Sequence, residues 1–395
     1  MTDLRKAGRS FSADMRSVCR SLGMIAVSVL LFGAPTLSWA AWELNMPRGV
    51  TETSQSIFDL HMLIFWICVG IGVIVYGLMF YSLIAYRRRS DQDKPSQFTH
   101  NSFLEWFWTL AAAVVLIIMA IPSTQTLIEI YDHSKGDVNI IVTGYQWKWG
   151  YEYPDEGFSF ISNSRTPQEE ISGQVDKGEF YLLDVDNPIY VPINKDVRFL
   201  ITARDVLHAF WIPDFGIKQD AIPGFFNIAK ANIQTPGVYR GVCAELCGLN
   251  HGFMPIVVVA VEEDEYRTWV VERQKEQLNR DQATKQAWGL EQLTEQGEEV
   301  YLRQCAACHQ ANGTGITGAF PTLAGSSVVQ GKSQDLIALV ADGVPGTAMQ
   351  AFDEILSPAE LGSVLTYIRT SWGNGKDLQQ PEVQPIEVLN YIEQN

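Results

Sequence analysis

Two long apolar runs dominate the first third of the chain. Leu60–Tyr86 spans 27 residues and Trp106–Ile128 spans 23, and neither contains Asp, Glu, Lys or Arg. Each run exceeds the roughly 20 residues that a helix needs to cross the hydrocarbon core of a membrane. The pattern therefore predicts a hairpin of two membrane-spanning helices within residues 41–135, in preference to a buried soluble hairpin.

Basic residues predict how this hairpin is oriented. Arg87, Arg88, Arg89 and Lys94 lie between the two runs. Because basic loops stay on the cytoplasmic side, both ends of the hairpin are expected to face outward. We therefore expect a protein of the bacterial inner (cytoplasmic) membrane with two spans, whose later soluble domains lie on the periplasmic side.

Residues 1–40 have the pattern of a secretory signal peptide. A basic start precedes an apolar core, Leu22–Gly33, that is too short to span a bilayer. Ser38-Trp39-Ala40 then supplies small residues at the positions that a signal peptidase requires. The alternative is an uncleaved membrane anchor.

From residue 136 to residue 271 the apolar positions alternate as they do in strands. Short β-rich runs at 138–142, 180–185, 197–203 and 256–261 are separated by Pro and Gly, which favours a sandwich or barrel. The period of two continues through four aromatic residues, which are expected on one face of a strand: Tyr145, Trp147, Trp149 and Tyr151.

A set of soft metal ligands lies near the end of this β segment. The motif is Cys-x3-Cys-x3-His-x2-Met, with one further His upstream: His208, Cys243, Cys247, His251 and Met254. Thiolate, imidazole and thioether donors favour copper, and a second Cys allows two thiolates to bridge two copper ions. A Cys243–Cys247 disulfide or a zinc site is the alternative, but neither explains Met254.

A second soluble domain is predicted at residues 292–374, after a polar and charged linker at 272–291 whose sequence is also compatible with partial helix. It contains Cys305-Ala-Ala-Cys308-His309, the attachment motif for c-type haem, in which the His is the proximal iron ligand. A redox Cys-x-x-Cys would need a βαβ pattern, which this segment lacks.

Later residues complete the prediction of a cytochrome c domain. Met349 is the expected sixth iron ligand, its alternative being a core-filling role, and the Pro321 segment is expected beside the proximal His. A closing helix begins at Ser357, and Tyr367 on that helix is expected to cross the first helix near Gly297. Residues 375–395 are predicted to be a flexible acidic tail.

Charge separates the membrane part from the soluble part. The formal net charge is −16, and residues 1–130 contribute +1 of it. So acidic a chain excludes nucleic acid as a main partner. Residues 131–270 carry −9 and residues 271–395 carry −8, so net charge does not attract the two soluble domains to each other.

The copper motif, with Asp205-Val206-Leu207-His208 and Asp220-Ala221-Ile222-Pro223-Gly224, resembles subunit II of the haem–copper cytochrome c oxidases. The resemblance covers roughly residues 50–270 and implies a dinuclear CuA centre on a cupredoxin fold. It implies these copper ligands, the third through its backbone carbonyl: His208, Cys243, Glu245, Cys247, His251 and Met254.

The resemblance also implies roles outside the copper ligands. The Glu245 carboxylate would reach a magnesium ion at the subunit I boundary, and Trp147 would be the point of electron entry. Glu105 would lie at the mouth of a proton path, although its own surroundings are typical of an interfacial carboxylate. Two positions depart from the family pattern, in which many members have His at position 145 and Arg at position 225: Tyr145 and Phe225.

Residues 291–374 resemble class I cytochromes c, so the whole chain resembles a caa-type subunit II. The implied fold is multi-domain, with a two-helix transmembrane hairpin, an all-β cupredoxin-like domain and an all-α class I cytochrome c domain. The implied function is an electron-transfer subunit of a proton-pumping, oxygen-reducing cytochrome c oxidase. The alternatives are the CuA subunit of a nitric oxide reductase complex and a stand-alone membrane-anchored electron-transfer protein.

The same resemblance implies the path and the partners. Electrons would pass from a soluble or membrane-bound cytochrome c, or a bc-type complex, through haem c and CuA to subunit I with its haem a and CuB. Subunit III is a further expected partner. If residues 272–291 were flexible they would span roughly 25 Å, so the haem domain could act as an intramolecular donor.

Overall fold

The computed structural model describes residues 45–87, 98–132, 134–353 and 355–394. One compact unit, Pro47–Asn395, contains nearly all of these residues. The predicted signal peptide and three of the four basic residues between the apolar runs, Arg88, Arg89 and Lys94, lie outside the described residues.

Both predicted spans are single helices. They are α2 (Glu52–Ala85) and α3 (Ser102–Ile130), and both are long and apolar enough to cross a membrane. Thr51 caps α2 in a capping box with Ser54, and its hydroxyl also donates a hydrogen bond to the carbonyl of Phe215. The start of α2 is therefore fixed to the β-sandwich domain that follows.

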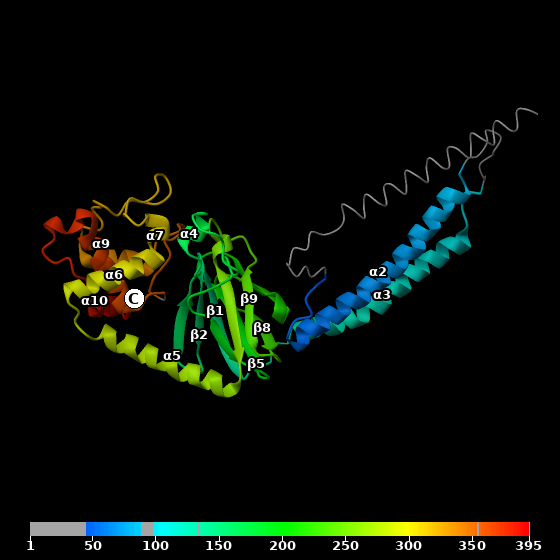
Figure 1. Cartoon of the computed structure of the whole chain (residues 1–395), viewed down its shortest axis with the longest axis horizontal. Helices are drawn as coiled ribbons and strands as arrows, with labels where there is room; N and C mark the ends of the chain where they lie inside the picture. The colour runs from blue at the N-terminus through cyan, green and yellow to red at the C-terminus, as the bar shows by residue number, and fades with distance from the viewer. Residues whose placement is uncertain (1–44, 88–97, 133, 354, 395) are drawn as a thin grey trace, which may run out of the picture. The chain divides into compact units, whose positions relative to one another are not determined.

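The β-sandwich domain contains two five-stranded sheets within the described residues. Their strand orders are β3-β2-β1-β5-β8 and β4-β10-β9-β6-β7 (Figure 1). The strands are β1 (Val138–Tyr145), β2 (Lys148–Tyr153), β3 (Phe158–Ser162), β4 (Ile189–Pro192), β5 (Asp196–Ala203), β6 (His208–Ile212), β7 (Ile217–Ala221), β8 (Asn227–Asn232), β9 (Gly237–Cys243) and β10 (Pro255–Val261).

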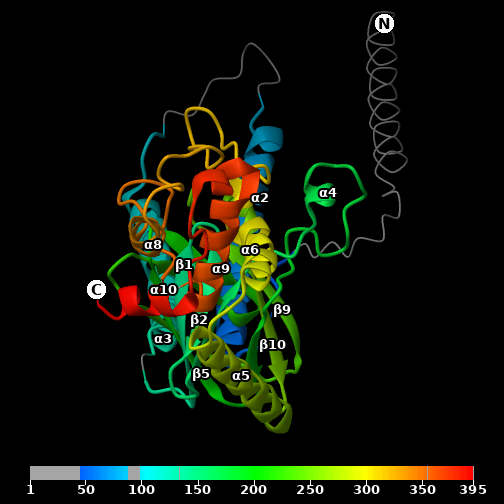
Figure 2. The ribbon, with the colours of Figure 1, turned by 90° about the vertical axis from the view of Figure 1, so that its left-hand side faces the viewer.

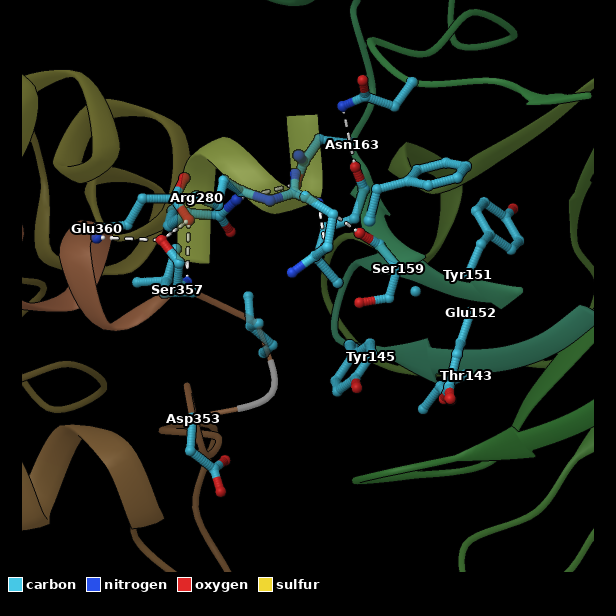
Figure 3. Close-up of a pocket in the computed structure, with 18 of the residues that line it drawn as sticks. Thr143, Tyr145, Tyr151, Glu152, Ser159, Asn163, Arg280, Asp353, Ser357 and Glu360 are labelled. Atoms are coloured by element: carbon cyan, nitrogen blue, oxygen red, sulfur yellow. Dashed lines mark hydrogen bonds between the residues drawn. The ribbon is translucent and has the colours of Figure 1, made fainter. Parts of the chain in front are cut away.

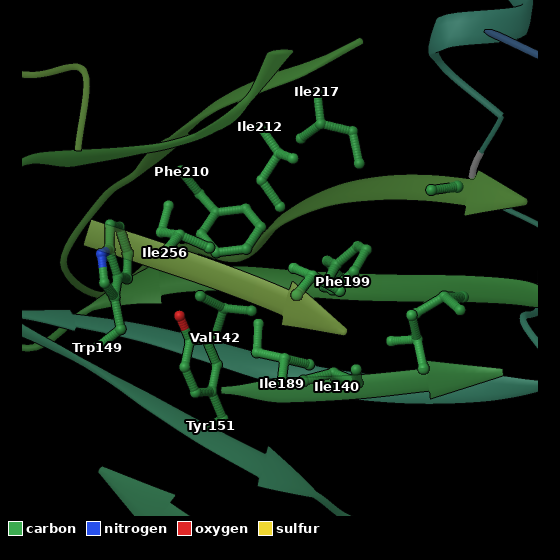
Figure 4. Close-up of a cluster of buried hydrophobic side chains, with 14 of the residues drawn as sticks. Ile140, Val142, Trp149, Tyr151, Ile189, Phe199, Phe210, Ile212, Ile217 and Ile256 are labelled. Atoms are coloured by element: carbon green, nitrogen blue, oxygen red, sulfur yellow. The ribbon is translucent and has the colours of Figure 1, made fainter. Parts of the chain in front are cut away.

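The two sheets enclose one apolar core, which is rich in aromatic side chains. Trp149, Tyr151, Phe199 and Phe210 are almost completely buried there, with branched aliphatic residues between them (Figure 4). β1 pairs in parallel with β5, and β10 pairs in parallel with β4, while the remaining pairs are antiparallel. The prediction of an all-β cupredoxin-like domain is confirmed.

The prediction that four aromatic residues share one face of a strand is wrong. β1 ends at Tyr145, the chain turns through Gln146 and Trp147, and β2 begins at Lys148, which pairs with Tyr145. The turn breaks the alternation of faces. Tyr145 consequently lies outside the sandwich core, whereas Trp149 and the following aromatic residues lie inside it.

The segment between the two soluble domains is largely helical. α5 (Glu263–Thr284) begins against the sandwich, where Trp269 meets the rings of Tyr153 and Phe158. It continues without interruption for 22 residues, or roughly 33 Å. Most of the predicted linker thus belongs to one continuous helix, which agrees with the partial helix that its sequence allows and differs from a fully flexible tether.

The C-terminal domain is a bundle of helices. They are α6 (Leu290–Gln304), α7 (Ala306–His309), α8 (Ser333–Asp342), α9 (Pro358–Thr370), the 3-10 segment η3 (Ser371–Asp377) and α10 (Pro385–Ile392). α6 and α9 lie side by side (Figure 2) and cross at Gly297, where a Cβ atom would lie 2.7 Å from that of Tyr367. The predicted crossing and the all-α domain are confirmed.

The final residues are part of this bundle and not a free tail. Val383 and Val388 are completely buried in the core of the C-terminal domain, and Arg369 donates hydrogen bonds to the carbonyls of Gln380 and Pro381. The acidic composition conceals an amphipathic pattern, because the apolar residues of α10 face the core. The structure therefore differs from the expected flexible tail.

Replacing Val388 by Ala tests this arrangement. Loss of two buried methyl groups should lower the free energy of unfolding of the C-terminal domain by about 2 kcal/mol. Ile386→Ala, at a position that is 42% exposed on the same helix, is the matched control and should have a much smaller effect. Guanidinium unfolding of the full chain in detergent, followed by near-ultraviolet circular dichroism, measures both. Equal stabilities would mean that α10 is not part of the core.

Candidate metal and haem centres

The predicted copper ligands converge at one end of the sandwich. His208 begins β6 and Cys243 ends the antiparallel neighbour β9, so the pairing of these strands places both at the same end. Cys243 Sγ lies 3.9 Å from His208 Nδ1 and 3.9 Å from Cys247 Sγ. The donor atoms of these three buried residues all lie within 4.8 Å of one another.

The loop after β9 supplies the remaining side chains. Cys247 Sγ lies 3.5 Å from His251 Nδ1 and 3.5 Å from Met254 Sδ. The carbonyl oxygen of Glu245 lies 3.3 Å from Cys243 Sγ, while the Glu245 side chain is exposed. The structure thus gathers all six predicted ligands of this centre in one cluster.

This donor set fits copper. The two sulfur atoms of Cys243 and Cys247 are 3.9 Å apart, far beyond the roughly 2.05 Å of a disulfide, so both residues are free thiols. A tetrahedral zinc site would be complete with two Cys and two His and would leave the Met254 thioether without a function. Two thiolates, two imidazoles and a thioether form the soft combination that selects copper.

The two thiols differ in protonation. The hydrogen bond with Cys247, supported by His208, lowers the pKa of Cys243 and so favours its thiolate form. The neighbouring Cys243 thiolate and burial together raise the pKa of Cys247. Metal binding supplies the positive charge that would deprotonate the second thiol as well.

Asp205 and Gly144 orient His208. The imidazole is completely buried, and its Nε2 lies 2.9 Å from Asp205 Oδ1, which leaves Nδ1 facing Cys243. Such outer carboxylates commonly fix the orientation of metal-binding imidazoles. Gly144 of β1 makes room for the ring, since a Cβ there would lie 2.8 Å from His208 Cδ2. The sequence reasoning assigned neither residue this function, although Asp205 stands three positions before His208.

Trp147 contacts the copper loop directly. Its indole Nε1 donates a hydrogen bond to the carbonyl of Cys247 at 3.2 Å, and Gln146 Nε2 donates to the same oxygen at 2.7 Å. The turn between β1 and β2 is thereby joined to the ligand loop. Gly248 follows with φ of +116°, and a Cβ at that position would lie 2.9 Å from Gln146 Nε2.

The residues predicted for haem line one cavity of about 490 Å³. His309 Nδ1 donates a hydrogen bond to the carbonyl of Pro321 at 2.9 Å, which leaves Nε2 free to bind iron and confirms that the Pro321 segment lies beside this imidazole. Met349 lines the same cavity, as do both cysteines of the attachment motif.

The surroundings of the cavity fit a covalently held haem. Burial raises the pKa of Cys305 to about 12, and that of Cys308 is raised as well, unlike the lowered pKa of a redox-active Cys-x-x-Cys. The remaining wall is mostly apolar, as a porphyrin requires, and includes Phe320, Leu336 and Val340. Gln146, Trp147 and Lys148 of the β-sandwich domain close one side.

Glu105 lies apart from both centres. It occupies the first turn of α3 and its side chain is exposed. The 25 residues that separate it from the end of α3 at Ile130 correspond to roughly 38 Å of helix. Phe225, where many members of the resembled family have Arg, is 56% exposed on a loop.

Three regions of the chain match known families. Residues 39–126 match "Cytochrome C oxidase subunit II, transmembrane domain", and residues 138–261 match "Cytochrome C oxidase subunit II, periplasmic domain". Residues 292–368 match "Cytochrome C oxidase, cbb3-type, subunit III". The first two matches cover the hairpin and the sandwich, and the third covers most of the C-terminal domain.

Named relatives agree with these matches. A probable cytochrome c oxidase subunit 2 of Rickettsia bellii is 34% identical over 265 residues, which are 67% of this chain and 96% of the relative. Cytochrome c oxidase subunit 2 of Chondrus crispus is 37% identical over 58% of this chain and 90% of the relative.

A solved structure is also similar, the periplasmic domain of subunit II of cytochrome oxidase of Bradyrhizobium japonicum. It is 42% identical and covers 36% of this chain and 97% of that one, with a TM-score of 0.33. With the Rickettsia relative matched over nearly its whole length, the chain belongs to the cytochrome c oxidase subunit II family and carries a C-terminal cytochrome c domain, as in a caa-type oxidase.

Proposed function

We propose that the chain accepts electrons from a cytochrome c or a bc-type complex and delivers them to subunit I of its oxidase. Family membership makes it an electron-transfer subunit of a terminal oxidase. The observation that carries the proposed path is the position of Trp147, which contacts the copper loop and lines the haem cavity. Neither a nitric oxide reductase nor a stand-alone carrier gains support from the relatives, which are named as oxidase subunits.

The chain's own residues would hold two one-electron carriers. Cys305 and Cys308 would attach haem c, with His309 and Met349 as its axial ligands. The six residues of the sandwich cluster would hold the copper pair, and Asp205 would keep His208 in its binding orientation. A rigid β framework around soft ligands changes little when the charge of the centre changes, and this favours electron transfer over catalysis at the metal.

The end of the copper loop is the proposed surface for subunit I. Leu246 and Leu249 are 77% and 79% exposed, so two large apolar side chains face outward beside the Glu245 carboxylate. Such a patch favours a protein partner. A magnesium ion bound by Glu245, the entry of protons at Glu105 and a contact with subunit III are the further parts of this proposal.

The proposed location is the bacterial inner membrane, with the soluble domains in the periplasm. The two apolar helices α2 and α3 support an anchor of two spans. The basic residues between the apolar runs support a cytoplasmic loop, which places the sandwich and the C-terminal domain on the opposite side.

Purification from native membranes tests the function. The tagged chain, extracted in a mild detergent, should carry with it haem a absorption and should consume oxygen when reduced cytochrome c is supplied. The matched control is the same extract from cells with the untagged chain. A preparation with haem c and copper but without haem a or oxygen consumption would contradict the oxidase assignment.

Cys247→Ser tests the dinuclear centre. Removal of one of two bridging thiolates should abolish the near-infrared absorption of a copper pair and reduce the copper content of the purified chain. Cys68→Ser, at an exposed cysteine in α2, is the control and should leave both unchanged. Copper content equal to that of the unaltered protein in Cys247→Ser would rule out a bridging function for this residue.

Trp147→Phe tests the point of electron entry. Phe keeps an aromatic ring but removes the N–H that donates to the Cys247 carbonyl. Electron transfer into the copper centre should slow roughly tenfold, with the copper and haem spectra unchanged. Trp211→Phe, at a partly exposed position on β6, is the control for flash-photolysis measurements. An unaltered rate would place electron entry elsewhere.

A further inference from the structure

The outer face of the β1–β2 hairpin is covered by the C-terminal domain. Tyr145 and Lys148 are paired directly across the two strands, so their side chains share the face that points away from the sandwich core. Side chains at strand ends beside a two-residue turn are ordinarily exposed to solvent. Here each residue is only 4% exposed, which means that another part of the chain covers them.

Tyr145 packs into the core of the C-terminal domain. It belongs to the same buried cluster as Phe352, Ile355 and Leu356, the residues that precede α9. Ile161 of β3, half-buried on the same outer face, packs against this cluster. An aromatic residue of one domain thus completes the apolar core of the other, a feature of a fixed interface rather than a chance encounter.

Lys148 reaches the C-terminal domain beside the haem attachment motif. Its Nζ donates a hydrogen bond of 2.7 Å to Oε1 of Gln304, the residue immediately before Cys305. The same ammonium lies 5.2 Å from the ring centroid of Phe352, within range of a cation–π contact. Both contacts cross from one domain to the other.

The ammonium of Lys148 is held without a carboxylate partner. Within the described part of the chain no carboxylate lies within ion-pair distance of Lys148, and burial lowers the pKa of Lys148 to about 8. The Asp205 carboxylate offsets part of this shift from beyond contact distance, but a buried charge without a carboxylate in direct contact is unfavourable for folding alone. Lys148 lies on the wall of the haem cavity, next to Trp147, so its charge can act on a haem bound in that cavity.

The rest of the interface contains a large cavity. A cavity of about 620 Å³ separates the outer face of β1–β3 from α5 and the C-terminal domain, and Arg280, Glu360 and Asp353 line it (Figure 3). Tight contact between the two domains is therefore concentrated at the hairpin end. Small changes at that end should affect docking more than changes around the cavity.

We propose that Tyr145 and Lys148 are positioning residues that dock the C-terminal domain on the outer face of the β1–β2 hairpin and hold the haem cavity against Trp147. The inference rests on the proposed function only in taking the cavity as the haem c site. With haem bound in this cavity, the positive charge of Lys148 would disfavour the oxidised iron and would raise the reduction potential.

Hydrogen exchange on the full chain tests the docking. Amides in the peptides that contain Tyr145 and Phe352 should exchange about tenfold faster in Tyr145→Ser and in Lys148→Met, since each substitution removes contacts between the domains. Tyr145→Phe keeps the ring and should exchange more slowly than Tyr145→Ser. Lys195→Met, at an exposed lysine before β5, is the control for loss of a positive charge.

Potentiometric titration of haem c tests the charge. Lys148→Met should lower the reduction potential, whereas Lys148→Arg and Lys195→Met should preserve it. Unchanged exchange at both peptides in Tyr145→Ser and Lys148→Met would overturn the docking, even with normal haem and copper spectra. Absence of those spectra from the unaltered protein would instead contradict the proposed function, so the two failures are distinguishable.

Discussion

One backbone atom, the carbonyl oxygen of Cys247, joins the two redox centres of this chain. It accepts hydrogen bonds from Gln146 and Trp147, so the loop that holds the copper ligands and the turn between β1 and β2 cannot move independently. The same turn positions Lys148 against Gln304. Through this short segment the geometry of the copper loop determines where the haem cavity lies, and the longer elements serve to hold the segment in place.

Much of this arrangement was predictable from the sequence, because its signals are local. Apolar runs of sufficient length identify α2 and α3, and the Cys-x-x-Cys-His motif identifies the haem cavity. The copper cluster was equally accessible, since four of its side chains lie in one loop of twelve residues, Cys243–Met254. The capping box at Ser357 also marked the start of α9 correctly.

Most of the features that sequence reasoning missed depend on contacts between distant segments. A polar run such as 272–291 is compatible with a helix or a coil. The packing of Trp269 on the sandwich favours the helical conformation of α5. The acidic composition of the C-terminal segment does not indicate that Val388 is buried, because this burial depends on the packing of α10 against α9. The aromatic pattern failed for a local reason, because the two-residue turn after Tyr145 shifts the alternation of faces and places Tyr145 and Trp149 on opposite faces of the hairpin.

A fixed interface changes how the acidity of the chain should be understood. Domains carrying −9 and −8 repel each other only weakly at physiological ionic strength, where screening acts over about 8 Å. The apolar contact of Tyr145 and the contacts of the buried Lys148 ammonium can therefore outweigh that repulsion, although the two domains do not carry opposite net charges. Once the domains are docked, the separation of the two centres no longer depends on the linker. Electron transfer between them then needs no flexible tether, so a helical α5 is compatible with it. The acidic surface that remains outside the interface is then available to a basic electron donor. The side chains that hold the two domains together, Tyr145 and Lys148, are not acidic.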